Sequence, residues 1–143
     1  MKFELRQGLI SDGEWLYQLY RLTMRSYIEE TWGWDEAFHI NGFKTNLHPT
    51  KFKIVIVEGI NVGAYIINNE PDHYWLEMIF ISPKVQKHGL GSSIINNLQK
   101  ESKKNGKPLK LSVLRVNPAK EFYSRFGFHV YDKNEDTFKM VWP

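Results

Sequence analysis

The chain of 143 residues contains no cysteine. This excludes a disulfide framework and a thiolate nucleophile, so covalent catalysis through cysteine is not available. The chain also lacks any apolar run close to the roughly 20 residues that a membrane-spanning helix needs. No secretion signal is recognisable, because Met1-Lys2-Phe3-Glu4 leads directly into charged residues. We therefore expect a cytoplasmic protein without a membrane partner.

A strong charge of either sign is also lacking. The formal net charge is +3 and the pI is about 9.0, which is too mild to indicate nucleic-acid binding. We expect no nucleic-acid partner, and a basic nucleic-acid binder is the weakest alternative function. His39 and His48 have no metal-ligand spacing with other candidate residues, so no metal site is predicted. Five lysines cluster after the glycine-containing segment described below: Lys100, Lys103, Lys104, Lys107 and Lys110. They are typical of a solvated helix end, and the alternative is that they attract a polyanionic ligand.

The composition of the chain indicates one globular domain that spans residues 1–143. Hydrophobic residues make up 42% of the chain and aromatic residues 15%, which is enough for a core. Periodicity and turn residues predict the order β α α β β β α β α β β, which indicates an α+β or mixed α/β sheet. The expected strands cover 3–6, 52–58, 62–67, 73–81, 109–116, 128–131 and 137–141. Ser11 and Glu14 have the spacing of a capping box at the start of the first helix.

The most informative stretch runs from the end of an apolar strand through a glycine-containing turn into a helix, over residues 81–98. A helix start leaves backbone N–H groups without partners and carries partial positive charge, so it is a natural anion site. The dinucleotide fingerprint fails here, because its third glycine would stand at Ile94. The Walker pattern fails too, because Gly91 is followed by two serines. The residues alone leave both a phosphate site and an ordinary strand-to-helix turn open.

Two motifs make the interpretation specific. Gln86-Lys87-His88-Gly89-Leu90-Gly91 has the form Q/R-x-x-G-x-G/A and follows an apolar strand that ends Ile79-Phe80-Ile81. Residues 117–128, which read NPAKEFYSRFGF, are similar to the pattern N-x-x-A-x-x-x-Y-x-x-x-G-F, although Ala119 follows the asparagine by only two positions. On these motifs the chain resembles the GNAT superfamily of acetyl-CoA-dependent N-acetyltransferases. The resemblance covers residue 52 to the C-terminus well and the first 50 residues only in outline.

The resemblance implies a GNAT-like fold of the α/β (α+β) class. Its central sheet would be mixed and mostly antiparallel, with about seven strands splayed at the cofactor site and about four helices. It also implies acetyl-CoA as co-substrate and an amine as acceptor, either a small molecule or a peptide or protein amine. The backbone of the strand end, the turn, two serine hydroxyls and the second motif would hold the cofactor. These residues are Ile79, Phe80, Ile81, Gln86, Lys87, His88, Gly89, Leu90, Gly91, Ser92, Ser93, Asn117, Ala119, Phe122 and Tyr123.

Two residues are candidates for the chemistry of acetyl transfer. Tyr123 could donate a proton or a hydrogen bond to the leaving thiolate, and the motif favours this role over the alternative of a tyrosine packed in the core. Glu77 is expected on the same strand face as Trp75 and Ile79, where family members carry a general base. A salt-bridged or solvent-facing glutamate is the alternative, and His73 is a weaker candidate for the base.

The acceptor site is expected between the first two helices. Aromatic side chains alternate there with carboxylates, which suits a cationic amine. The alternative is a helix end whose tryptophans belong to the core and whose acids are solvated. The candidate residues are Tyr27, Glu30, Trp32 and Trp34. A catalytically weak module that only binds CoA remains the alternative function, and the chain could be a monomer or a homodimer.

Overall fold

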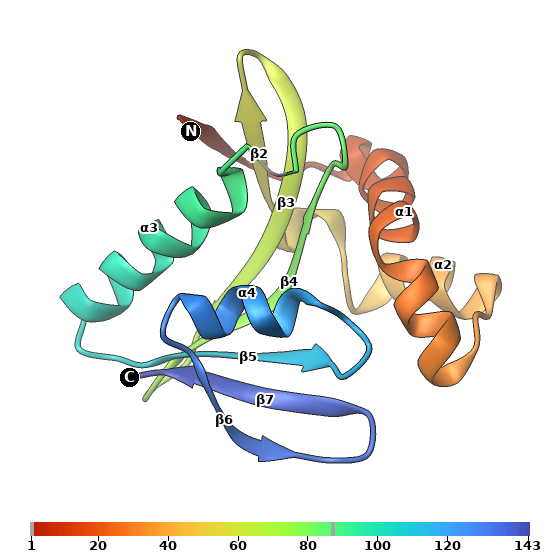
Figure 1. Ribbon diagram of the computed structural model, residues 1–143. Helices are drawn as coiled ribbons and strands as arrows, with labels where there is room; N and C mark the ends of the chain where they lie inside the picture. The colour runs from red at the N-terminus through yellow and green to blue at the C-terminus, as the bar shows by residue number, and fades with distance from the viewer. Residues whose placement is uncertain (1, 87) are drawn as a thin grey trace. The chain divides into compact units, whose positions relative to one another are not determined.

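The computed structural model describes residues 2–86 and 88–143, and it has the element order that the sequence predicts. The described residues form four α-helices, two short 3-10 helices and seven strands (Figure 1). The strands are β1 (Glu4–Gln7), β2 (Lys53–Val57), β3 (Ile60–Asn69), β4 (Tyr74–Ile81), β5 (Leu109–Leu114), β6 (His129–Lys133) and β7 (Thr137–Trp142). The helices are η1 (Ile10–Asp12), α1 (Gly13–Trp32), α2 (Glu36–Thr45), η2 (Pro49–Lys51), α3 (Leu90–Lys104) and α4 (Ala119–Arg125).

The strands make one seven-stranded sheet in the order β1-β2-β3-β4-β5-β7-β6. β1 with β2, β2 with β3, β5 with β7 and β6 with β7 are antiparallel, whereas β4 and β5 are parallel. A parallel pair needs a long crossover, and α3 supplies it between β4 and β5. The predicted mixed, mostly antiparallel sheet with about four helices is therefore confirmed.

Two compact units divide the chain. The first contains Met1–Ile66 with Met78–Leu90, and the second contains Ile67–Glu77 with Gly91–Pro143. β3 and β4 therefore contribute residues to both units. That residues 1–143 act as a single domain stays a prediction.

In the first unit, α1 and α2 pack on each other through aromatic rings. The ring centroids of Tyr17 and Phe43 lie 5.4 Å apart in an edge-to-face arrangement. Tyr20 contacts Phe43 at 4.9 Å and Phe80, on β4, at 6.1 Å. Phe52 is fully buried and contacts Phe80 at 5.5 Å. These rings fix the two helices to the β2–β4 part of this unit.

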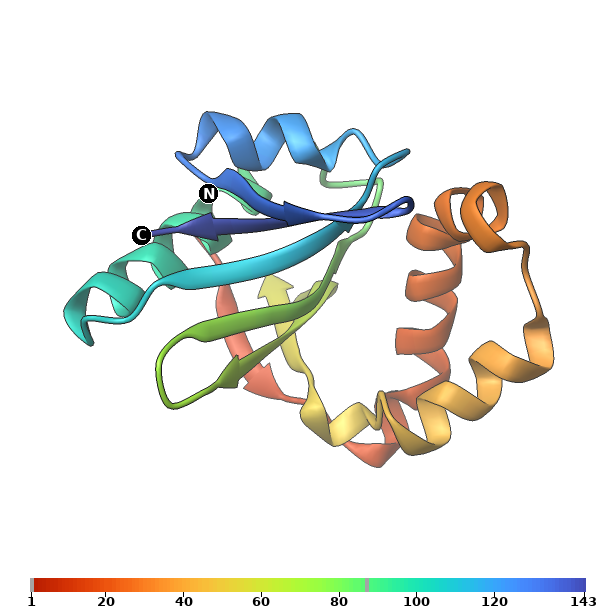
Figure 2. The same cartoon turned by 90° about the horizontal axis from the view of Figure 1, so that it is seen from below.

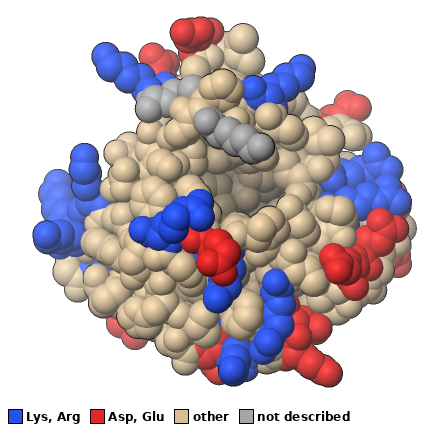
Figure 3. Space-filling view, viewed as in Figure 1, with Lys and Arg blue, Asp and Glu red and all other residues tan. Residues whose placement is uncertain are grey.

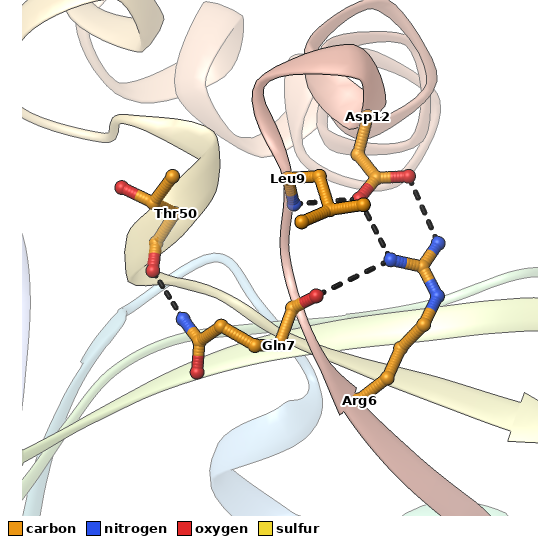
Figure 4. Close-up of polar contacts among 5 residues, drawn as sticks. All are labelled: Arg6, Gln7, Leu9, Asp12 and Thr50. Carbon is orange, nitrogen blue, oxygen red and sulfur yellow. Dashed lines mark hydrogen bonds and ion pairs between the residues drawn. The ribbon is translucent and has the colours of Figure 1, made fainter.

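The start of α1 differs from the prediction. Asp12, not Ser11, is the N-cap residue, and no side chain caps the helix, so the predicted capping box of Ser11 and Glu14 is wrong. The Asp12 carboxylate instead accepts two hydrogen bonds from the Arg6 guanidinium, at 2.8 and 2.9 Å (Figure 4). It also accepts one from the backbone N–H of Leu9, at 2.8 Å. These contacts join the end of β1 to the start of α1 through η1.

In the second unit, Figure 2 shows α4 along one face of the β5–β7–β6 strands. Leu109, Leu111 and Met140 on these strands are buried. The side-chain amide of Gln99 on α3 donates to the carbonyl oxygen of Phe126, at 2.8 Å, and so joins α3 to the end of α4. The buried stripe of α3 consists of Leu90, Ile94, Ile95, Leu98, Gln99 and Ser102.

Candidate functional site

The parallel ladder between β4 and β5 is short. Tyr74, Trp75 and Leu76 pair with Leu109, Lys110 and Leu111 respectively. Within the described residues the ladder stops there, although β4 continues to Ile81 and β5 to Leu114. A backbone group that leaves a ladder still needs a hydrogen-bond partner. The described ladder therefore ends just before Glu77, and the expected splay at Ile79 and Ile81 stays a prediction.

Glu77 lies on the strand face that its spacing predicts. Tyr74 and Leu76 are buried on one face of β4, whereas Trp75 and Glu77 are half-buried on the other. One Glu77 carboxylate oxygen accepts a hydrogen bond from the side-chain amide of Asn68 on β3, at 2.7 Å. This bond orients the Glu77 carboxylate and leaves it capacity to accept further hydrogen bonds. The sequence analysis did not identify Asn68, because its contact with Glu77 depends on strand register.

The glycine turn is held against the end of β4 by a side chain of the first motif. The side-chain amide of Gln86 donates to the carbonyl oxygen of Ile81, at 2.8 Å. The backbone N–H of Ser82 donates to Val62 on β3, at 2.7 Å. Gly89 has a φ of +83°, a left-handed conformation that favours glycine. α3 then begins at Leu90, which directs its first N–H groups toward the turn.

Lys87, one of the predicted cofactor residues, lies outside the described residues. The other predicted members of this segment are Gln86, His88, Gly89 and Leu90 in the first unit and Gly91, Ser92 and Ser93 in the second. Chain continuity brings them together as the turn and the first residues of α3. That these residues bind an anion stays a prediction.

The second motif contains the whole of α4 and the residues on either side of it. The Asn117 side-chain oxygen accepts a hydrogen bond from the backbone N–H of Ala119, the first residue of α4, at 2.9 Å. The side-chain NH2 of Asn117 is then the group of this amide that could donate to a ligand. Gly127 follows α4 with a φ of +89°, and a Cβ there would lie 3.3 Å from the Trp142 indole. Both ends of α4 are thus fixed by residues of the motif.

Tyr123 lies inside the second unit, on α4. Its ring contacts those of Phe122 and Phe128 edge to face, at centroid distances of 5.5 and 5.7 Å. Burial raises the pKa of the Tyr123 phenol to about 12. The phenol therefore remains protonated at neutral pH and can act as a hydrogen-bond donor. Phe122 is half-buried beside it.

A cavity of about 610 Å³ opens between the C-terminal part of α1 and α2 in the first unit. We call it the α1–α2 pocket. Trp32 is the one predicted acceptor residue that lines it, and Tyr27, Glu30 and Trp34 do not. Its lining residues are Tyr20, Ile28, Trp32, Gly33, Asp35, Phe38, His39, Gly42, Phe43, Asn46 and Leu47.

Trp34 supports a wall of this pocket. Its ring stacks on the imidazole of His39 at a centroid distance of 4.0 Å, and its indole N–H donates to the Glu36 carboxylate. The Arg25 guanidinium lies 5.4 Å from the Trp34 ring. The bond from Trp34 is the main reason why the pKa of Glu36 is lowered. Trp34 is therefore held in place by both an anion and a cation.

Tyr20 and His39 are residues of the pocket that the sequence analysis missed. The Tyr20 hydroxyl lies 3.0 Å from His39 Nδ1. Burial raises the pKa of Tyr20 to about 12 and lowers the pKa of His39, so both groups are neutral at pH 7. The spacing of His39 and Phe43, four residues apart on one helix face, was the available sequence signal.

Lysine and arginine side chains gather over the C-terminal end of α3, at the left edge of Figure 3. Lys103 and Lys104 occupy the last turn of this helix. Lys107 does not simply face solvent, because its ammonium group donates to the Asn69 side chain at 2.5 Å and to the Glu70 carbonyl oxygen at 2.8 Å. This cation therefore joins the end of α3 to the β3–β4 turn within the second unit.

Residues 50–130, more than half of the chain, match the family described as an acetyltransferase (GNAT) domain. No curated protein matches the chain in sequence. No helix of the described residues is long and apolar enough to cross a membrane. The matched range includes the glycine turn, Glu77 and Tyr123.

Several solved structures have a similar fold. PaiA N-acetyltransferase from Thermoplasma acidophilum, in complex with coenzyme A, has a TM-score of 0.77 and 20% identity over 99% of this chain and 98% of that chain. An acetyltransferase from Thermus thermophilus has a TM-score of 0.77 and 18% identity over 100% and 97%. Arabidopsis thaliana Naa50, in complex with the bisubstrate analogue CoA-Ac-MVNAL, has a TM-score of 0.69 and 16% identity over 100% and 99%. Because the sequence identities are this low, the similarity shows that the chain shares the fold of these proteins and nothing beyond the fold.

Proposed function

This chain belongs to the GNAT acetyltransferase family, and is thereby an acyltransferase; we propose that it transfers an acetyl group from acetyl-CoA directly to an amine. The family match, which includes both motifs, is the observation that carries the proposal. Two structural neighbours support the choice of donor and acceptor, because one contains coenzyme A and the other a CoA–acetyl–peptide analogue. The acceptor is accordingly a small amine or a peptide or protein amine.

The glycine turn is the proposed site of the CoA pyrophosphate. Backbone N–H groups of residues 86–91 and the hydroxyls of Ser92 and Ser93 would bind it, with Lys87 and His88 adding positive charge. The described residues fit this role, because a Cβ at Gly89 would meet no heavy atom within 4 Å, which leaves the backbone accessible. The 15-residue α3 helix adds the favourable end of its dipole.

The strand end of β4 is the proposed site of the pantetheine arm. The backbone of Ile79 and Ile81 would pair with the arm as with an added strand, in line with the early end of the β4–β5 ladder. The Phe80 side chain is buried and packs on Phe52, so this residue would contribute only its backbone. Asn117 would donate from its side-chain NH2, and Ala119 and Phe122 would lie along the arm.

In the proposed reaction the amine nitrogen attacks the thioester carbonyl carbon, and the carbon–sulfur bond breaks. Glu77 would take the proton of the amine, directly or through water, and the N–H of Ile79 would polarise the carbonyl. Tyr123 would donate to the departing sulfur. A thiol of pKa about 8.5 is more acidic than this phenol by about 3.5 units, or roughly 5 kcal/mol, so complete proton transfer from Tyr123 is unfavourable. Its proposed role is therefore a hydrogen bond to the thiolate.

Two assays test the function. Acetyl-CoA at 100 times its dissociation constant should stabilise the chain by about 2.7 kcal/mol, which a thermal shift detects. Release of free thiol should then depend on an added amine from a broad panel. Glu77→Gln and Tyr123→Phe should retain the thermal shift and lose most of the thiol release. Absence of a thermal shift at millimolar acetyl-CoA would contradict the proposal, and binding without turnover would favour a CoA-binding module.

A further inference from the structure

The α1–α2 pocket combines apolar walls with exposed aromatic side chains. Trp32 is 61% exposed and Phe38 is 69% exposed, and both line the pocket. Water-exposed rings beside an open cavity are a feature of binding surfaces, because an isolated core would have buried them. The volume of about 610 Å³ lies in the range of small-molecule sites.

Charge recognition is weak in this pocket. None of its described lining residues is a lysine, an arginine or a glutamate. Asp35, the one acidic lining residue, accepts a hydrogen bond from the backbone N–H of Phe38 at 3.1 Å and caps α2. The nearby Glu36 carboxylate is engaged by Trp34 and lies 3.3 Å from the Arg21 guanidinium. A ligand would therefore meet mainly ring faces and ring edges.

The rings are also fixed before any ligand arrives. His39 is stacked on Trp34 at 4.0 Å and contacts Phe38 edge to face at 5.2 Å. Its Nδ1 atom lies 3.0 Å from the Tyr20 hydroxyl, and Tyr20 packs on Phe43 at 4.9 Å. A preformed aromatic site loses little conformational entropy on binding.

We propose that the α1–α2 pocket binds an aromatic group carried by the acceptor amine. That the bound amine is the acetyl acceptor rests on the proposed function. The affinity of the pocket for an aromatic amine can nevertheless be measured without acetyl-CoA. Burying one ring against such walls should make phenethylamine bind roughly tenfold tighter than n-propylamine. The selectivity of the pocket thus comes from ring contacts.

Gly42 provides a test that does not rely on removing core side chains. It lines the pocket, lies inside α2, and an added Cβ there would meet no heavy atom within 4 Å. Gly42→Leu should fill the cavity and weaken phenethylamine binding at least tenfold, while raising the melting temperature because leucine favours the helix more than glycine does. Gly42→Ala is the matched control, and should raise the melting temperature while it largely retains binding.

A second pair of variants examines the mouth of the pocket. Phe38→Ala removes an exposed ring that lines it, and should lower the affinity for phenethylamine several-fold without changing that for n-propylamine. Leu22→Ala removes an apolar side chain that is 68% exposed on α1 and does not line the pocket, so it should change neither affinity.

The affinities are measured by isothermal titration calorimetry with the full chain, first without and then with coenzyme A. Equal affinities for phenethylamine and n-propylamine, or an unchanged phenethylamine affinity in folded Gly42→Leu, would overturn the proposal. Peptides that begin with phenylalanine or with serine then show whether the aromatic group comes from a peptide or from a free amine. Acetyl transfer without a preference for aromatic amines would refute the proposed role of the pocket and leave the proposed function intact. Selective binding of phenethylamine without acetyl transfer would refute the proposed function and leave the binding role of the pocket intact.

Discussion

Tyr123→Phe separates the chemistry of the phenol from its packing, because it removes one hydroxyl group and retains the ring. The contacts with Phe122 and Phe128 are made by the ring, so the folded structure should persist. Loss of one donor to the leaving group should lower kcat by about 10²–10³-fold. The dissociation constant of acetyl-CoA should change little.

The raised pKa of Tyr123 gives a second, independent readout. Burial shifts this pKa from the ordinary value near 10 to about 12 in the folded state. The unfolded chain therefore loses this proton first as pH rises. The resulting stability is fully present below pH 10 and is lost as the pH rises through about 12, by about 3 kcal/mol in total. By pH 11 about half of it is lost.

Urea unfolding of the natural chain and of Tyr123→Phe at pH 9 and pH 11 measures this loss as a difference between the two proteins. The natural chain should lose about 1 kcal/mol more than the variant between these pH values. If both proteins respond equally to pH, Tyr123 is not buried as the structure indicates. If the variant has normal kcat, the proposed hydrogen bond to the thiolate does not contribute to the reaction.

Three further changes test other parts of the molecule. Glu77→Gln should lower kcat/KM by about 10²–10⁴-fold, whereas replacing a purely structural Glu77 should leave kcat/KM nearly unchanged in the folded variant. Asp12→Ala should lower the free energy of unfolding by about 1–2 kcal/mol at pH 7. Because the hydrogen bond from Arg6 lowers the pKa of Asp12, this contribution is present above the ordinary carboxyl pKa and is lost as pH falls through the lowered value. The difference between the two proteins in urea unfolding should therefore shrink as the pH is lowered below the ordinary carboxyl pKa. Gly8→Ala should cost more than about 2 kcal/mol by urea unfolding, since the new Cβ would lie 2.2 Å from the Pro49 carbonyl oxygen, and a variant of normal stability would contradict this close approach.

The sequence predicted the order of elements and the fold class because strand alternation, glycine turns and two motifs are local signals. Gly89, for example, is required by its positive φ, and Gly106 also has a positive φ just after α3. The start of α1 was predicted wrongly because a local rule competed with a contact from another element. Arg6, on β1, binds the carboxylate of Asp12, and no capping pattern includes that partner.

The candidate acceptor pocket was predictable only as a region. Its walls require α2 to pack on α1, which brings His39 to Tyr20, 19 residues away in the chain. The composition of the segment indicated that aromatic rings and carboxylates would bind a cationic amine, and of the four named residues Trp32 lines the pocket. The composition could not indicate that the Trp34 indole would donate a hydrogen bond to Glu36 and stack on His39. Such contacts depend on helix rotation, which local periodicity does not determine.

The most direct test of the central proposal is the stoichiometry of transfer. The chain is incubated with acetyl-CoA and an amine that supports thiol release, and free thiol and acetylated amine are quantified together, the latter by mass spectrometry. Direct transfer predicts that both products form in equal amounts, and that neither exceeds the buffer background when Glu77→Gln replaces the natural chain. Thiol release without acetylated amine would contradict the account, because it would show hydrolysis of acetyl-CoA in place of transfer to an acceptor.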